Sequence, residues 1–166
     1  MTKQVDCGVV VNTHGIRGEV KIKSFLDDGA FEGLKQVYIG GLPYSLLSTR
    51  GHKGFVLAFL EGVDSVDKAM ALKNQDIKAD RDSFALPEGH YFYGDIYGFE
   101  VYDHRTRRPV GRLAEVRESP AGMLYVIEDV GRTFMVPAVE AFKRGVFFDR
   151  KTLEIETIYG MLPDEN

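Results

Sequence analysis

Cysteine, long apolar runs and recognisable catalytic motifs are all scarce in this chain of 166 residues. The single cysteine, Cys7, has no partner for an internal disulfide, and no cysteine cluster is available for a metal site. Its strand-like context favours a small buried hydrophobic residue over a nucleophile. The longest apolar runs, such as Phe55–Leu60, are far shorter than the roughly 18 residues that span a bilayer. We therefore expect no membrane segment and, without a signal-peptide pattern, a cytoplasmic protein.

Local signatures of enzyme active sites are also missing from the sequence. It contains no phosphate-binding loop of the Walker type and no nucleophile elbow, and its four histidines are scattered at positions 14, 52, 90 and 104. We accordingly expect no catalytic residue, no bound metal and no cofactor. A site assembled from distant residues by folding is the alternative, because spacing along the chain does not test it.

The formal net charge of −4 is unevenly distributed. Residues 1–86 carry 11 basic and 11 acidic side chains, whereas residues 87–166 carry 10 basic and 14 acidic ones. A protein that grips nucleic acid over a broad surface needs a basic face, so only a local patch could do so here. An acidic half is better suited to a basic protein partner.

Short segments rich in β-branched and aromatic residues predict a mainly β protein made of two antiparallel barrels, with one short helix in the first. The helix is expected from a cap at Asp64 to about Asn74. The strands of the first half are expected at Val5–Val11, Glu19–Ser24, Gln36–Ile39, Tyr44–Thr49, Phe55–Glu61 and Asp76–Ala79. Those of the second half are expected at Phe99–Tyr102, Val110–Glu118, Met123–Glu128, Arg132–Val136, Val146–Asp149 and Leu153–Glu156, with a helical turn within Pro137–Lys143.

Proline and glycine near position 85 predict the division between the barrels. We expect an N-terminal domain over residues 1–82, a linker over 83–90 and a C-terminal domain over 91–166. The last residues, 162–166, contain a proline and end in polar side chains, so we expect a tail that is mobile until bound.

Residues 90–98, His-Tyr-Phe-Tyr-Gly-Asp-Ile-Tyr-Gly, crowd four aromatic rings beside two glycines. Gly94 and Gly98 are expected to make a turn, so this stretch lies at a junction where some rings face outward. Strand alternation would place Tyr91 and Tyr93 on one face and Phe92 on the other. We expect at least one ring to be core and the run as a whole to contact a partner, the alternative being that all the rings fill the junction between the barrels.

Two basic segments are candidate RNA contacts. In the loop Thr13–Glu19, Gly15 and Gly18 are expected to shape a turn that displays His14 and Arg17, whose guanidinium can fork onto a phosphate. A wide turn without a binding role explains the same glycines equally well. The second segment is a predicted hairpin loop that carries Arg105, Arg107 and Arg108, followed by Arg112. Such clusters are most often simply solvated, but the preference for arginine also favours contact with RNA, with carboxylates or with the other domain.

These motifs, in this order, resemble those of the RimM family of bacterial ribosome maturation factors. The resemblance rests on four segments that cover nearly the whole chain: Gly8–Val11 with His14–Val20, the helix and strand of Asp64–Asp76, Tyr91–Gly98, and Val136-Pro137. It implies a six-stranded barrel related to a domain of translation elongation factors, followed by a PRC-barrel.

The resemblance also implies a function. Members of this family are not known as enzymes; they associate with immature 30S subunits, bind the head ribosomal protein that is number nineteen of the small subunit, and promote folding and processing of 16S rRNA. Two adjacent tyrosines of the family signature, implicated in that association, correspond to Tyr91 and Phe92. Phe92 lacks the hydroxyl, so only stacking or apolar contact remains there.

We therefore expect a monomeric, non-enzymatic assembly factor whose partner-binding residues are Tyr91, Phe92 and Tyr93. His14 and Arg17 would meet RNA or the interface between the barrels. A general RNA-binding barrel is the first alternative, and it would bind unrelated RNA with a steep salt dependence. An RNA-processing enzyme is the second, which the missing acid–base constellation disfavours.

Overall fold

The computed structural model describes residues 4–80 and 91–165, and the chain divides into two compact units, residues 1–91 and 92–166. Each unit contains its own sheet, which confirms the mainly β prediction. The predicted linker, 83–90, lies outside the described residues. Tyr91, which was expected to begin the second domain, falls in the first unit, because its backbone bonds to Asp27 in that unit.

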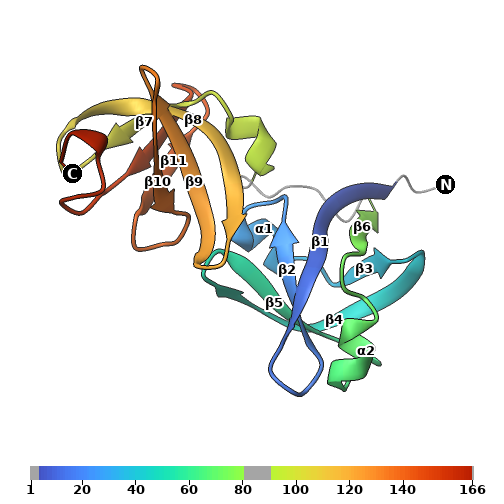
Figure 1. Ribbon diagram of the computed structural model, residues 1–166. Coiled ribbons are helices and arrows are strands. Elements are labelled where there is room, and N and C mark those ends of the chain that lie inside the picture. Colours follow the sequence, from blue (N-terminus) through green and yellow to red (C-terminus); the bar gives the residue numbers. More distant parts are fainter. Residues whose placement is uncertain (1–3, 81–90, 166) are drawn as a thin grey trace. The chain divides into compact units, whose positions relative to one another are not determined.

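The first unit is a closed barrel with the strand order β1-β2-β5-β4-β3-β6, in which every pair is antiparallel (Figure 1). Its elements are β1 (Gln4–His14), β2 (Glu19–Ser24), α1 (Asp28–Glu32), β3 (Gln36–Ile39), β4 (Leu42–His52), β5 (Phe55–Leu60), α2 (Val66–Met70) and β6 (Asp76–Asp80). Because the barrel is closed, each of its six strands is hydrogen-bonded to a neighbour on both sides.

Alternation along β2 shows how the sequence sorts side chains in this barrel. Val20 and Ile22 are completely buried in the interior, while Lys21 and Lys23 between them are partly exposed. The core also receives buried residues from β1, β3, β5 and β6: Cys7, Val10, Val37, Ile39, Val56, Ala58, Leu60, Ile77 and Ala79. Cys7 is fully buried, as predicted.

The helices of this unit differ from the single helix predicted. α1 was missed, because it has only five residues and includes a glycine; its start is set by Asp27, whose carboxylate accepts a hydrogen bond from the Ala30 N–H at 3.1 Å. α2 ends at Met70, and its cap is Ser65, which accepts from the Lys68 N–H at 3.2 Å. Asp64, the predicted cap, instead forms an ion pair with Lys68 at 3.0 Å.

The second unit holds a six-stranded sheet with the order β10-β9-β8-β7-β12-β11. Its elements are the 3-10 helix η2 (Tyr93–Ile96), β7 (Glu100–Asp103), β8 (Arg108–Ser119), β9 (Gly122–Asp129), β10 (Arg132–Pro137), β11 (Lys143–Phe147), β12 (Thr152–Ile155) and the 3-10 helix η3 (Pro163–Glu165). β12 pairs with β7 in parallel, whereas only antiparallel pairs were expected. The core is formed chiefly by Ile96, Val101, Leu113, Met123, Tyr125, Ile127, Val136, Leu153 and Ile155.

Two segments of this unit correct the sequence-based expectations. β11 begins at Lys143, three residues before its predicted start, directly after a turn in which the Lys143 N–H donates to the Val139 carbonyl at 3.1 Å. The C-terminal segment, expected to be mobile, forms η3, and Leu162 before it is buried. Burial of that apolar side chain gives the segment a defined place on its unit.

Candidate functional site: a basic face of the barrel and an occupied arginine loop

The loop between β1 and β2 is shaped by its glycines. Gly15 and Gly18 both have a positive φ, at 69° and 94°. A Cβ at Gly18 would lie 2.6 Å from the Val63 carbonyl oxygen and 2.8 Å from the Ser65 nitrogen, so the loop passes directly against the turn that precedes α2. This backing fixes the loop, and it leaves Ile16 84% exposed and Arg17 exposed at the tip.

Cationic side chains gather on the barrel face beside this loop. Register places Lys21 of β2, Leu57 of β5 and Arg50 of β4 in one row across three neighbouring strands. The Lys21 ammonium lies 4.1 Å from the centroid of the Phe55 ring. Lys53, at the tip of the β4–β5 hairpin, is exposed. We call the set His14, Arg17, Lys21, Arg50, His52 and Lys53 the basic face.

The pKa of His52, one of two histidines on the basic face, reflects the positive charge around it. The rings of His14 and His52 lie 5.2 Å apart between centroids. Desolvation lowers the pKa of His52, and the charges of His14, Lys53, Arg50 and Lys21 lower it further. A concentration of positive charge that disfavours another cation is suited to anionic ligands.

Glu19 is the acidic member of this neighbourhood, and Arg50 neutralises it. The Arg50 Nε and Nη2 donate to the two carboxylate oxygens of Glu19 at 3.2 and 3.0 Å, in a bidentate pair. Glu19 is buried, while the side chain of Arg50 remains 58% exposed. The pair therefore orients Arg50 and leaves the surrounding face positive.

A hollow of about 410 Å³ lies between the β1–β2 loop and the strands β4 and β5. Its lining combines the loop with one residue from each of three strands: Glu19 of β2, Arg50 of β4 and Phe59 of β5. The sequence drew attention to His14 and Arg17 only. Lys21, Arg50, His52 and Lys53 were missed, because strand pairing alone brings them to the same face.

The aromatic stretch is more buried than its sequence suggests. Tyr91 and Tyr93 are 3% and 7% exposed, whereas Phe92 is partly exposed and Tyr97 is 43% exposed. The expectation that at least one ring is core is confirmed. Strand alternation over the first three rings is not what the structure shows, because Tyr93 begins the 3-10 helix η2 instead of continuing a strand. Partner contact through Tyr91, Phe92 and Tyr93 stays a prediction, and of these three Phe92 offers the most ring surface.

Backbone bonds explain the placement of Tyr91. Its N–H donates to the Asp27 carboxylate at 2.7 Å, and the Asp27 N–H donates to the Tyr91 carbonyl at 2.9 Å. Farther along, the Tyr97 hydroxyl accepts from the Val116 N–H at 3.1 Å. Gly98 has a positive φ of 88°, while Gly94 lies within η2 with an ordinary φ. Only the second of these two glycines therefore has a conformation that side chains disfavour.

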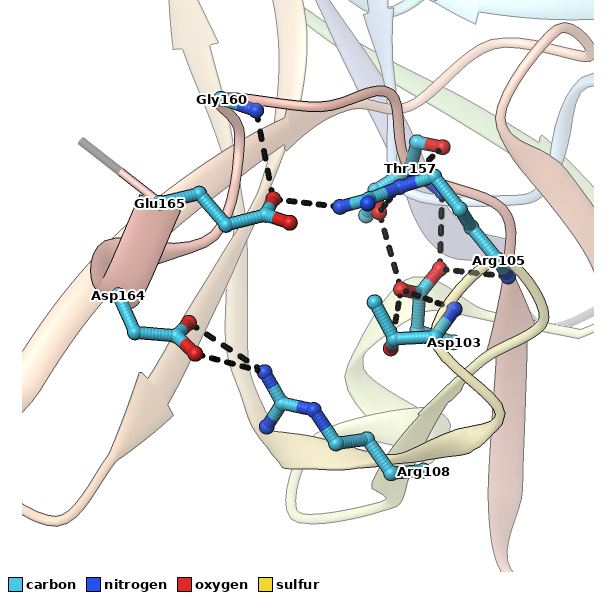
Figure 2. A network of polar contacts seen from close by, with 8 residues as sticks. Asp103, Arg105, Arg108, Thr157, Gly160, Asp164 and Glu165 are labelled. Carbon is cyan, nitrogen blue, oxygen red and sulfur yellow. Dashed lines mark hydrogen bonds and ion pairs between the residues drawn. The ribbon is translucent and has the colours of Figure 1, made fainter.

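The arginine loop between β7 and β8 is largely occupied by the C-terminal segment (Figure 2). Arg105 donates to the Thr157 carbonyl at 3.1 Å and hydroxyl at 3.0 Å, and it forms an ion pair with Glu165. Arg108 forms an ion pair with Asp164 at 3.1 Å. Of the predicted RNA contacts in this loop, Arg107 alone has an exposed side chain that forms no ion pair with residues 4–80 and 91–165. The segment Thr157–Glu165 thus acts as a clasp on the loop.

Asp103 is the centre of the clasp. It is completely buried, and it accepts hydrogen bonds from the Thr157 N–H at 2.9 Å, the Thr157 hydroxyl at 3.0 Å and the Thr106 hydroxyl at 2.7 Å. Burial raises the pKa of Asp103, but the bonds from Thr157 and Thr106 outweigh it and hold the pKa below its ordinary value. The carboxylate is therefore a structural anchor, ionised in the folded protein.

Within the part of the chain that the structure describes, no group of three or more histidine, cysteine or acidic side chains could hold a metal ion. None of the described helices has the length and apolar character needed to cross a membrane.

Comparison with known proteins connects these two units to one family. Residues 5–84 match the model of the RimM N-terminal domain, and residues 93–161 match that of the RimM PRC barrel domain. A ribosome maturation factor RimM from Staphylococcus epidermidis is 32% identical over 168 residues, which cover 96% of this chain and 99% of that protein. The chain belongs to the RimM family.

Other RimM proteins show the same full-length correspondence. A ribosome maturation factor RimM from Ruminiclostridium cellulolyticum is 32% identical over 169 residues, covering 98% of this chain and 99% of its own. Among solved structures, a RimM protein from Pseudomonas aeruginosa aligns with a TM-score of 0.49 at 23% identity, over 94% of this chain and 98% of that one. The two domain matches and the full-length sequence relatives confirm the resemblance inferred from the sequence motifs, and the second sheet is that of a RimM PRC barrel domain.

Proposed function

We propose that this chain is a non-enzymatic assembly factor for the small ribosomal subunit. The observation that carries the proposal is the correspondence of both units, over nearly the full length, with proteins named ribosome maturation factors. In this proposal the protein holds the head ribosomal protein number nineteen together with adjacent 16S rRNA, and so favours the native arrangement of the head.

The two units are suited to different partners. The barrel of the first unit carries the basic face, which is complementary to RNA phosphates. Residues 87–166 carry the excess of acidic side chains, which complements a basic ribosomal protein. Phe92 is the proposed aromatic anchor for that protein, and its neighbours in the sequence, Tyr91 and Tyr93, are buried beneath the surface.

The mechanism is differential binding. A factor that binds the immature arrangement more tightly than the mature one shifts the population toward productive intermediates and leaves when the mature surface forms. It acts as a monomer in the cytoplasm and needs neither cofactor nor metal.

Binding to immature and mature small subunits tests this function directly. We expect saturable binding to precursor particles that is at least about tenfold tighter than binding to mature subunits, since release requires that difference. Equal affinity for both particles would contradict the mechanism. Equally tight binding to unrelated RNA would favour a general RNA-binding module instead.

The aromatic anchor is tested by titrating the head ribosomal protein with Phe92→Ala. We expect an affinity loss of about 2 kcal/mol, because truncation removes a partly exposed ring from the contact. Phe148→Ala is the matched control, since Phe148 is also a partly exposed phenylalanine of the second unit and should leave the affinity unchanged. Equal losses in both variants would argue against a specific anchor.

A further inference from the structure

The hollow beside the β1–β2 loop is open to solvent, and its lining joins charged side chains to two large apolar ones, Ile16 and Phe59. Its volume of about 410 Å³ falls within the roughly 300–1,000 Å³ range of pockets that hold small molecules. His14, Gly15, Ile16 and Arg17 form one side, and Arg50, Phe59 and Glu19 form the other. Because Gly18 holds the loop against the turn at Val63–Ser65, the hollow is preformed.

Two guanidinium groups on the rim can receive a phosphate. Arg17 is exposed and has no ion-pair partner in the described part of the chain. Arg50 uses Nε and Nη2 on Glu19, so Nη1 takes no part in that pair, and the side chain is more than half exposed. An arginine whose plane is already fixed loses little entropy when its remaining N–H groups bind an oxyanion.

The same hollow offers apolar surface for a flat ring. Phe59 lines it from β5, and Ile16 projects from the loop with 84% of its surface exposed. Phe59 and Ile16 therefore give the hollow an apolar side next to the two arginines. A phosphate site next to an apolar wall matches a nucleotide whose base is unstacked from its neighbours.

The surroundings extend this chemistry beyond one nucleotide. Lys21, Lys53 and the His14–His52 pair continue the positive surface from the hollow toward the tip of the β4–β5 hairpin. Glu19, the acidic residue of the lining, is buried and neutralised by Arg50, so it does not repel an anion. A chain of phosphates can therefore continue along the basic face.

We propose that this hollow binds one unstacked nucleotide of single-stranded RNA, with Arg17 and Arg50 on its phosphate and Phe59 and Ile16 against its base. The proposal rests on the proposed function, because it assigns the RNA contact of the assembly factor to a defined site. Single-stranded loops are the RNA elements in which a base can be splayed into such a site.

The test is a titration of the full chain with a short single-stranded oligouridine and with a duplex RNA of equal length, followed by fluorescence anisotropy. We expect the single strand to bind more tightly. Arg17→Ala should weaken binding roughly tenfold or more, and it should reduce the slope of log affinity against log salt concentration by about one, the loss of one phosphate contact. Arg17→Lys should have an intermediate affinity. Phe59→Leu should weaken it severalfold, because it removes the ring but keeps the site apolar.

Lys73→Ala is the matched control. Lys73 is exposed on the same unit outside the basic face, and its loss changes the charge by the same amount. Its affinity should stay within about twofold of wild type. Thermal unfolding of each variant checks that the barrel remains folded.

Several outcomes would overturn the site. These are equal losses for Arg17→Ala and Lys73→Ala, equal affinity for duplex and single strand, competition by polyglutamate as effective as by RNA, and no binding of oligouridine at all. If the last result accompanied intact selectivity for immature subunits, the site would be wrong and the assembly function would stand. If selectivity for immature subunits were lost while oligouridine binding stayed intact, the site would stand and the assembly function would be wrong.

Discussion

Cys7 shows what burial does to a single reactive group. Its Sγ lies 3.4 Å from the Ile77 carbonyl oxygen, and the side chain is fully buried in the first barrel. Desolvation, reinforced by the nearby charge of Asp6, raises the pKa of the thiol to about 12. Since the thiolate is the reactive species, the folded protein holds almost none of it near neutral pH.

We therefore expect Cys7 to resist alkylation by iodoacetamide at pH 8 in the native protein and to react readily in denaturant. Mass spectrometry of the modified protein measures both states. Because exposure in denaturant restores an ordinary thiol, the denatured sample is its own control. Rapid modification of the native protein would contradict the buried placement of Cys7.

Asp103 is the second residue whose environment decides its role. We expect Asp103→Asn to lower the free energy of unfolding by about 2 kcal/mol, because a neutral amide replaces a buried carboxylate that accepts several hydrogen bonds. Urea denaturation measures the change. Asp149→Asn is the control, since Asp149 is exposed and its replacement should be neutral.

The same carboxylate predicts a pH dependence with a definite sign. The pKa of Asp103 in the folded protein lies below its ordinary value of 3.8. Its contribution to stability is therefore fully present above that ordinary value and is lost as the pH falls through the folded pKa. Urea midpoints measured between neutral and acidic pH should converge for wild type and Asp103→Asn at the acid end. A difference that stayed constant down to the lowest pH would contradict an ionised Asp103.

At the scale of elements, the position of the β1–β2 loop depends on the close approach of Gly18 to the turn at Val63–Ser65. We expect Gly15→Ala to destabilise the first unit by roughly 1 kcal/mol, the cost of a left-handed backbone for alanine. Gly18→Ala carries that cost and in addition roughly 1–3 kcal/mol, because its Cβ would overlap the backbone at Val63 and Ser65. Denaturant unfolding of both variants gives the comparison, and equal losses would show that the loop is not held against that turn.

The clasp is the corresponding element of the second unit. η3 is only three residues long, and its acidic side chains reach the loop between β7 and β8 (Figure 2). Arg105 is the principal reason why the pKa of Glu165 is lowered. These ion pairs join residues more than fifty positions apart in the sequence, so the local pattern predicts contact with RNA or with carboxylates without deciding between them.

At the scale of the whole molecule, each unit has its own core. We therefore expect local destabilisation to stay within the unit that carries it. In hydrogen exchange, Asp103→Asn should accelerate the amides of β7, β8, β11 and β12 and leave those of β1–β6 unchanged. Gly18→Ala should show the reverse pattern. Acceleration in both units by either variant would indicate one cooperative structure.

The sequence by itself determined most strands, their turns and the family. The alternation in Glu19–Ser24 depends only on neighbours in the chain, and β2 and β3 were predicted with the bounds that the structure shows. Motifs spread over both halves were enough to indicate RimM.

Only the tertiary structure decided which of the conspicuous side chains are available. Tyr91 and Tyr93 are buried, Arg105 and Arg108 pair with Glu165 and Asp164, and Lys21 and Arg50 join His14 on one face. The parallel pairing of β7 with β12 was likewise decided only by the tertiary structure, because it joins strands about fifty residues apart. Burial, ion pairing and strand register are set by contacts between distant segments, which no local pattern of residues encodes.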